Sequence, residues 1–143
     1  MISLQKPADF NPVFEVVSCF VEKKGKIILL HRQDHAREGN TWGVPAGKLK
    51  DKETLTEGVL REIKEETGIT LKEPNLKYFK KIYVKYPNYD FVYHIFQTKI
   101  KGKEEIKLNP EEHKNYKWIT PKNALKMNLI EDEDACIKLF YKI

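Results

Sequence analysis

Three glutamates fall close together on one side of a predicted helix in the first half of the chain. The segment Leu55–Thr67 contains Glu62, Glu65 and Glu66. At about 100° per residue, Glu65 lies about 60° to one side of Glu62 and Glu66 about 40° to the other. Carboxylates this close repel one another, so a cation between them would stabilise the group. Oxygen donors without His or Cys favour Mg²⁺ or Mn²⁺ over zinc, because these ions prefer octahedral oxygen coordination.

A helix face that is acidic only because it faces water is the ordinary explanation of such a cluster. The neighbouring residues argue against it. Val59, Leu60 and Ile63 form an apolar stripe beside the acids, so the acidic edge borders the buried face. Gly58 falls in the acidic sector, where it costs roughly 1 kcal/mol of helix stability relative to Ala. We expect it to leave open space over the carboxylates for a metal ion, water and phosphate.

The residues around this helix follow a fixed pattern. Gly47 is followed after five residues by Glu53 and, after seven more, by Arg61-Glu62-Ile63-Lys64-Glu65-Glu66-Thr67-Gly68-Ile69. This resembles the signature of the Nudix hydrolase family, Gly-x5-Glu-x7-Arg-Glu-U-x-Glu-Glu-x-Gly-U with U a bulky aliphatic residue, at every specified position of 47–69. The segment 42–47 also resembles the family's Trp-x-x-Pro-Gly-Gly lead-in, with Ala46 in place of the first of these glycines.

The resemblance implies a role for each matched residue. In the family, three carboxylates of the signature hold the divalent metal ions, and here these are Glu62, Glu65 and Glu66. The backbone carbonyl of the first glycine is a further metal ligand, here Gly47, where the missing Cβ permits close approach.

The resemblance also implies residues that support the site. The family's arginine and first glutamate pair to fix the loop against the helix, a role that falls on Arg61 and Glu53.

Further residues are expected to take part in the reaction. The general base in the family is a signature glutamate, here Glu65 or Glu66, or a glutamate of a later loop. For the loop, the candidates are Glu112 and Glu111, of which Glu112 is favoured. The segment 112–118 resembles a Glu-His-x-x-Tyr-x-Trp stretch found in some family members.

Basic side chains are expected to meet the phosphates. By analogy with the family, Arg32 and Lys48 are the best-placed candidates for substrate binding, although each could instead be an ordinary surface charge. His113, next to Glu112, could contact a phosphate or lie on the surface. The aromatic residues Tyr83, Tyr86, Tyr93 and Trp118 offer stacking surfaces for a base, but strand aromatics more often belong to the core.

The rest of the chain predicts the elements that position these residues. Apolar stretches separated by turn residues predict strands at 13–21, 26–31, 76–86, 91–100, 105–108 and 116–119. Thr54 and Glu57 form a capping-box pattern and Gly68 supplies a stop, which predicts the helix Leu55–Thr67. A short helix is expected from Thr120-Pro121 to 127, and another over 132–141. The segment 42–47 is predicted to be loop or strand end.

Composition sets the class of protein. The chain has 143 residues, of which 41% are hydrophobic and 33% charged, so we expect one globular domain over 1–143. No secretory signal is present, and no apolar run approaches the roughly 20 residues that cross a membrane, so no membrane partner is expected. Two cysteines without metal-site spacing favour a reducing, cytoplasmic setting. The net charge of +5 suits an anionic partner and leaves nucleic acid open. A homo-oligomer also remains open.

The resemblance implies a fold and an activity. The fold is α+β, a Nudix-type α/β/α sandwich with a mixed sheet and a loop–helix–loop that carries the signature. The activity is a Mg²⁺- or Mn²⁺-dependent pyrophosphohydrolase, acting on the phosphoanhydride bond of a nucleoside diphosphate linked to another group. A nucleoside triphosphate is the first expected substrate, and dinucleoside polyphosphates rank next. The sequence also leaves open an RNA 5′-end pyrophosphohydrolase and a non-catalytic nucleotide-binding module.

Overall fold

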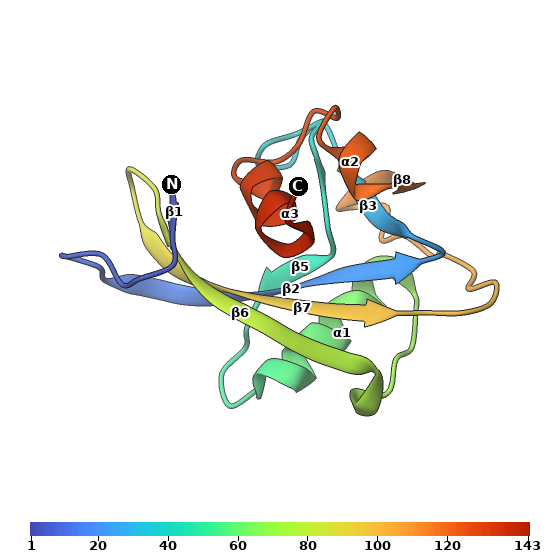
Figure 1. The fold of residues 1–143 in the computed structure, drawn as a ribbon, viewed down its shortest axis with the longest axis horizontal. Helices are drawn as coiled ribbons and strands as arrows, with labels where there is room; N and C mark the ends of the chain where they lie inside the picture. Colours follow the sequence, from blue (N-terminus) through green and yellow to red (C-terminus); the bar gives the residue numbers. More distant parts are fainter.

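The strands form one twisted sheet around which the helices are arranged (Figure 1). The computed structural model describes residues 1–143. Its strands are β1 (Ile2–Ser3), β2 (Pro12–Lys23), β3 (Lys26–Arg32), β4 (Trp42–Gly43), β5 (Ala46–Lys48), β6 (Leu76–Lys85), β7 (Asp90–Lys99) and β8 (His113–Ile119). Its α-helices are α1 (Leu55–Thr67), α2 (Pro121–Ala124) and α3 (Glu133–Tyr141), and a 3₁₀ turn occupies Glu73–Asn75.

The sheet is mixed, as the sequence predicts. The strand order is β1-β6-β7-β2-β3-β4, with β5 also paired to β2 and β8 to β3. Strands β2 and β7 run parallel, whereas the other strand pairs are antiparallel. The parallel pair lies at the centre of the sheet and joins its two halves.

The helices cover opposite faces of this sheet (Figure 1). Val17 of β2 packs in one apolar cluster with Val59 and Ile63 of α1, whereas Phe20 of the same strand packs in a second cluster with Ile137 of α3. Because side chains alternate along a strand, β2 contributes to a core on each face. The predicted α/β/α sandwich of the α+β class is confirmed.

The structure agrees closely with two local predictions, the turn between the first two long strands and the ends of the helix Leu55–Thr67. The turn between β2 and β3 falls at Lys24 and Gly25, whose φ angles are +51° and +76°, as a two-residue hairpin requires. Helix α1 begins after Thr54, whose hydroxyl accepts the N–H of Glu57 at 3.1 Å while the carboxylate of Glu57 accepts the N–H of Thr54 at 2.9 Å. The helix ends at Gly68 with φ +79°. Both ends of the helix that carries the acidic cluster are therefore fixed by local bonds.

The predicted strand at 105–108 is wrong. This segment pairs with no strand; its one backbone bond to the signature helix joins the N–H of Lys107 to the carbonyl of Thr67 at 2.8 Å. Ile106 and Leu108 pack against the α1-side core, so their alternation reflects burial on one side rather than pairing. Strand β8 accordingly begins at His113, earlier than the predicted 116.

Other short elements differ from the predictions. Strand β1 was not expected, and the segment predicted as loop or strand end forms the two short strands β4 and β5. Helix α2 ends at Ala124 rather than at 127. None of the helices has the length and apolar character of a membrane-spanning segment.

Candidate active site

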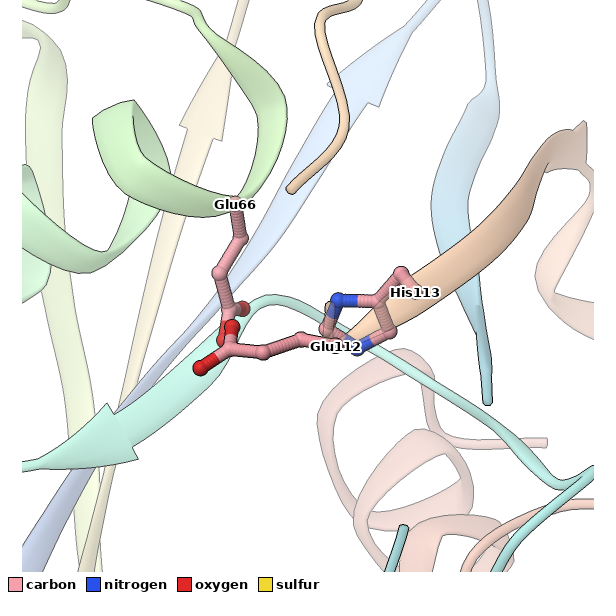
Figure 2. Close-up of side chains that lie close together, drawn as sticks. All are labelled: Glu66, Glu112 and His113. Carbon is pink, nitrogen blue, oxygen red and sulfur yellow. The ribbon is translucent and has the colours of Figure 1, made fainter. Parts of the chain in front are cut away.

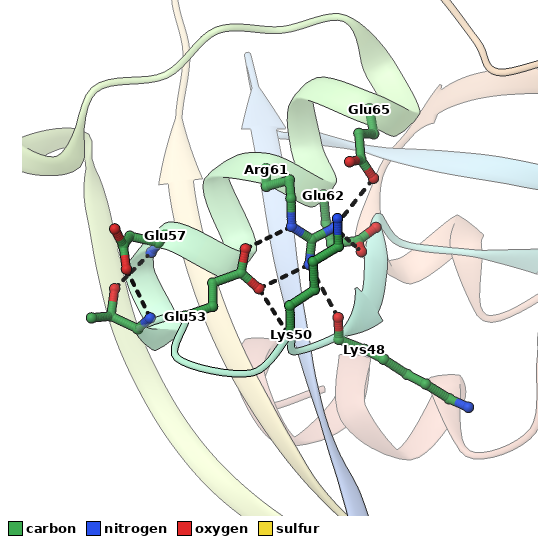
Figure 3. Close-up of polar contacts among 8 residues, drawn as sticks. Lys48, Lys50, Glu53, Glu57, Arg61, Glu62 and Glu65 are labelled. Carbon is green, nitrogen blue, oxygen red and sulfur yellow. Dashed lines mark hydrogen bonds and ion pairs between the residues drawn. The ribbon is translucent and has the colours of Figure 1, made fainter.

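Arg61 ties the loop before α1 to the helix itself (Figure 3). Its Nε donates to Oε2 of Glu53 at 2.6 Å and its Nη2 donates to Oε1 at 2.9 Å, so the pair is bidentate. Nη2 also donates to the carbonyl of Lys48 at 3.1 Å, and the N–H of Lys50 donates to Glu53 at 2.9 Å. The Arg61 guanidinium lowers the pKa of Glu53 to about 2. The pair that the sequence predicts is present and fixes the loop 48–53.

The same guanidinium reaches two of the predicted metal ligands. Nη1 of Arg61 donates to Glu62 at 2.7 Å and to Glu65 at 3.2 Å (Figure 3). Glu62 is largely buried, and this burial raises its pKa. Its carboxyl group lies against Gly47, where an added Cβ atom would overlap it. The glycine therefore brings the backbone of β5 beside this carboxylate, whereas Glu65 remains half-exposed.

Glu66 is the most enclosed carboxylate of the cluster. Its residue is 6% exposed, and its Oε1 accepts the N–H of Ala46 at 3.0 Å. Burial raises the pKa of Glu66 well above its ordinary value, and the nearby charges of Glu62 and Glu112 raise it further. The helix thus holds a carboxylate where a negative charge is costly unless a cation lies beside it.

The loop before β8 brings a second group of side chains to Glu66 (Figure 2). Ligand atoms of Glu66, Glu112 and His113 all lie within 4.8 Å of one another. Gln33 holds this loop in place, because its N–H donates to the carbonyl of Glu112 at 3.0 Å and its Nε2 donates to that of Pro110 at 2.8 Å. Glu112, predicted from the sequence, therefore lies next to a carboxylate of the signature.

His113 is buried, so the surface position that the sequence left open for it is wrong. Its Nδ1 is enclosed and has no hydrogen-bond partner. Burial lowers the pKa of His113 to about 4, and the positive charge of Arg32 contributes in the same direction. The imidazole is consequently neutral at physiological pH.

The two predicted substrate-binding residues line one cavity together with Glu66. Nε of Arg32 donates to the carbonyl of Arg37 at 2.7 Å, which directs the side chain along the loop after β3. Nζ of Lys48 lies 4.3 Å from the centre of the Phe14 ring, and Figure 3 shows this side chain extending away from Arg61. Both cations lie at the cavity, and their substrate contacts remain predictions.

Gly58 does not open space over the acids, so that expectation is wrong. A Cβ atom at this position would lie 2.7 Å from Cδ1 of Leu49 and 3.1 Å from Oε1 of Glu53. The glycine therefore lets the loop 48–53 pack closely on α1. The open space next to the acids is instead the cavity that Glu66 lines.

The cavity has a volume of about 220 Å³ and a largely apolar, aromatic lining. Its lining includes five aromatic residues that contact one another, Phe14, Tyr86, Tyr89, Phe91 and Tyr93. Glu133, at the start of α3, is buried in the same lining; its Oε1 accepts the N–H of Val44 at 2.8 Å and its Oε2 has no partner. Burial raises the pKa of Glu133 to about 7. The backbone of 44–46 thus donates to two buried carboxyl groups, that of Glu133 from α3 and that of Glu66 from α1.

Sequence reasoning did not identify Glu133. A signal was present, because Glu133 precedes Cys136 and Ile137 by three and four residues and so shares the buried face of α3. Of the four aromatic candidates, Tyr86 and Tyr93 line the cavity. Tyr83 instead packs edge-on against Phe10, and Trp118 lies under the ammonium group of Lys23.

Comparison with known proteins agrees with this geometry. A family model described as NUDIX domain matches residues 12–140. The CTP pyrophosphohydrolase of Escherichia coli (strain K12) is 33% identical over 57 residues, which are 40% of this chain and 42% of that protein. The matched segments span less than half the length of this relative and of two others, a fusion protein of Bifidobacterium longum and a Nudix hydrolase of Bacillus subtilis.

Solved structures match over nearly the whole chain. A MutT protein from Methanosarcina mazei Go1 has a TM-score of 0.77 at 24% identity and covers 95% of this chain and 96% of its own. A bifunctional NMN adenylyltransferase/ADP ribose pyrophosphatase from Francisella tularensis, complexed with AMP and a Mn ion, has a TM-score of 0.72 at 24% identity and covers 94% of this chain and 43% of its own. At these identities the matches show a shared fold.

Proposed function

Because this chain belongs to the NUDIX domain family, we propose that it is a divalent-metal-dependent pyrophosphohydrolase that cleaves a phosphoanhydride bond of a nucleoside triphosphate. The observation that supports this most directly is that one cavity is lined both by Glu66 of the acidic cluster and by the aromatic rings and Glu133. A nucleotide needs both a site for its phosphates and an apolar site with a few polar groups for its base. The full set of signature carboxylates argues against a binding module without catalysis.

The metal ions that Nudix hydrolases generally use would be held by Glu62, Glu65, Glu66 and the carbonyl of Gly47. These residues fit Mg²⁺ or Mn²⁺, because all are oxygen donors and because Glu62 and Glu66 are buried with raised pKa values. Such ions, when bound, neutralise charge on phosphate oxygens and make a bound water more acidic.

The chain's own side chains would then perform the remaining tasks. Glu112 lies beside Glu66 and would take the proton of the attacking water, with Glu65 and Glu66 as the alternative bases. Arg32 and Lys48 would hold or attract the phosphates at the cavity. The bidentate pair of Arg61 and Glu53 would keep the loop carrying Lys48 in place.

Glu133 supports a narrower proposal about which nucleobase the substrate carries. Its partnerless carboxyl oxygen can accept a hydrogen bond from an exocyclic amino group. Adenine, cytosine and guanine carry such a group, whereas uracil and thymine do not. The similarity to an enzyme named for CTP is consistent with this preference.

A panel of nucleotides tests the proposal. The purified protein would be supplied with Mg²⁺ or Mn²⁺ and with the common nucleoside triphosphates, ADP-ribose, diadenosine tetraphosphate and 5′-triphosphorylated RNA. Products would be resolved by ³¹P NMR, which separates phosphate from pyrophosphate release. We expect a nucleoside triphosphate with an amino-bearing base to be hydrolysed fastest, and this preference to weaken in Glu133→Gln. Faster hydrolysis of RNA or of the dinucleotide would contradict the proposed substrate.

A further inference from the structure

The strongest unexplained group in the molecule is the imidazole of His113. Its residue is 6% exposed, and its Nδ1 is buried without a hydrogen-bond partner. A buried polar atom without a partner is destabilising, so an arrangement that retains one needs a compensating interaction. The ring lies beside two carboxyl groups, Glu66 and Glu112, as Figure 2 shows.

From this arrangement we propose that His113 supplies a nitrogen ligand to a divalent metal ion shared with Glu66 and Glu112. The inference rests on the proposed function, because Glu66 belongs to both groups of ligands. Glu112 would bind the ion through one carboxylate oxygen, which leaves its other oxygen for the proton of the attacking water. It adds a nitrogen donor to a site that the sequence pattern describes by oxygen donors alone. The ligand atoms of the three residues lie within 4.8 Å of one another, as a common metal centre requires.

Hydrogen bonds fix the Glu66 carboxylate and the backbone of the segment that carries Glu112 and His113 before any ion binds. Glu66 is fixed by the N–H of Ala46, and the carbonyl of Glu112 by the N–H of Gln33. The N–H of His113 donates to the carbonyl of Asn109 at 2.9 Å, which closes the turn that precedes β8. The segment of Glu112 and His113 therefore need not move relative to Glu66 to bind a cation, and only the exposed Glu112 side chain has to adjust.

A nitrogen donor changes which ion the site prefers. Mg²⁺ strongly favours oxygen ligands and water, whereas imidazole suits transition metals. Two carboxylates with one imidazole should consequently favour Mn²⁺ or Co²⁺ over Mg²⁺. A site made only of the signature glutamates would lack this source of selectivity.

Pulsed electron paramagnetic resonance of bound Mn²⁺ tests the proposal directly, since a coordinated imidazole adds a ¹⁴N modulation to the Mn²⁺ signal. We expect this modulation in the wild-type protein, its loss in His113→Gln and its retention in His31→Gln, whose ring stacks on Trp42 and does not belong to the group of three ligands. Calorimetric titration should show Mn²⁺ affinity falling about tenfold or more in His113→Gln, since even outer-shell partners are worth that much. Mg²⁺ affinity should fall much less.

A wild-type Mn²⁺ complex without ¹⁴N modulation, or a modulation that persists in folded His113→Gln, would overturn the proposal. If His113→Gln does not fold, ¹⁵N-histidine labelling of the unaltered protein still decides whether a histidine coordinates, because the ¹⁴N pattern must then give way to a ¹⁵N pattern. Hydrolysis of nucleotides by a protein whose Mn²⁺ shows no nitrogen coupling would reject the role of His113 and leave the proposed function standing. Absence of hydrolysis across the panel would reject the proposed function instead.

Discussion

Glu66 combines three properties at one position: a place in the signature, near-complete burial, and a carboxyl group that borders both the cavity and the loop of Glu112. Glu66→Gln keeps the size of the side chain and its bond from the N–H of Ala46 but removes the charge. We expect kcat to fall at least about 100-fold with the fold retained, because the proposed metal site loses a charged ligand.

Steady-state kinetics and circular dichroism of Glu66→Gln would check this expectation. The matched control is Glu104→Gln, an exposed position outside the signature, which should keep wild-type kinetics. Comparable turnover in the two variants would remove Glu66 from the proposed mechanism.

Glu133 should make the stability of the protein depend on pH. Burial raises its pKa from the ordinary value of 4.5 to about 7, so between these values the folded state holds a proton that the unfolded chain has released. The resulting stabilisation is complete below about pH 4.5 and is lost as the pH rises through about 7. We expect the free energy of unfolding, measured relative to Glu133→Gln, to fall by about 3 kcal/mol across this window.

Urea unfolding of both proteins at several pH values measures this difference. Asp134→Asn, an exposed position on the same helix, is the control and should show no such slope relative to the wild type. If the difference in free energy of unfolding between Glu133→Gln and the wild type did not change with pH, the carboxyl group would not be buried as described.

The loop and helix of the signature act as one structural unit. Gly47 lets β5 approach Glu62 of α1, and Arg61 of α1 binds Glu53 and the carbonyl of Lys48. Gly47→Ala places a methyl group where the carboxyl of Glu62 lies. We expect Glu62 to be displaced, with a loss of about 1–3 kcal/mol of stability and about a tenfold or greater loss of Mn²⁺ affinity.

Calorimetric titration with Mn²⁺ and urea unfolding of Gly47→Ala test these two effects. Gly25→Ala serves as the control, because its φ of +76° also makes a side chain unfavourable while it lies in the β2–β3 turn. That variant should lose about 1 kcal/mol of stability and keep its Mn²⁺ affinity. Unchanged Mn²⁺ binding in Gly47→Ala would contradict the role given to this glycine.

Elements set by nearby residues were predictable, and those set by distant partners were not. The bounds of α1 follow from Thr54, Glu57 and Gly68, which all act within one or two turns. The segment 105–108 shows the limit, because alternating apolar residues indicate one buried side but do not specify a strand to pair with. Strand β1 depends in the same way on β6, which lies far along the chain.

In the candidate site, too, the contacts between residues close in sequence were predictable and those between distant residues were not. Arg61 and Glu53 are eight residues apart, and their pair followed from the resemblance of the signature. The closeness of Glu112 to Glu66 was expected only by analogy, and the position of His113 beside them needed the structure. Glu133 was missed because its surroundings come from β-strands and loops far away in the sequence.

At the scale of the whole molecule, divalent ions should stabilise the fold. The proposed ligands from α1, β5 and the segment 112–113 come together only in the folded chain, so we expect ions to bind the native state and not the unfolded one. At an ion concentration 100 times the Kd, the free energy of unfolding should rise by about 2.7 kcal/mol. This corresponds to a rise in Tm of roughly 5–10 °C for a chain of this size.

Thermal unfolding with Mn²⁺, and again after excess chelator is added, would measure this gain. The shift should be reversed by the chelator and greatly reduced in Glu66→Gln. An equal shift in that variant would show that the ions act elsewhere on the protein.

The parallel pairing of β2 with β7 has a consequence for how the chain folds. The hydroxyl of Ser18 on β2 donates to the carbonyl of His94 on β7, a contact between residues 76 positions apart. Since β2 contributes to both cores, neither core is complete until this long loop has closed. Contacts so distant in sequence slow folding, so we place this protein among the slower-folding domains of its size. During synthesis, a nascent chain must extend past Lys99 before its central strand has both neighbours, and until then the edge of β2 is open to pairing with other chains.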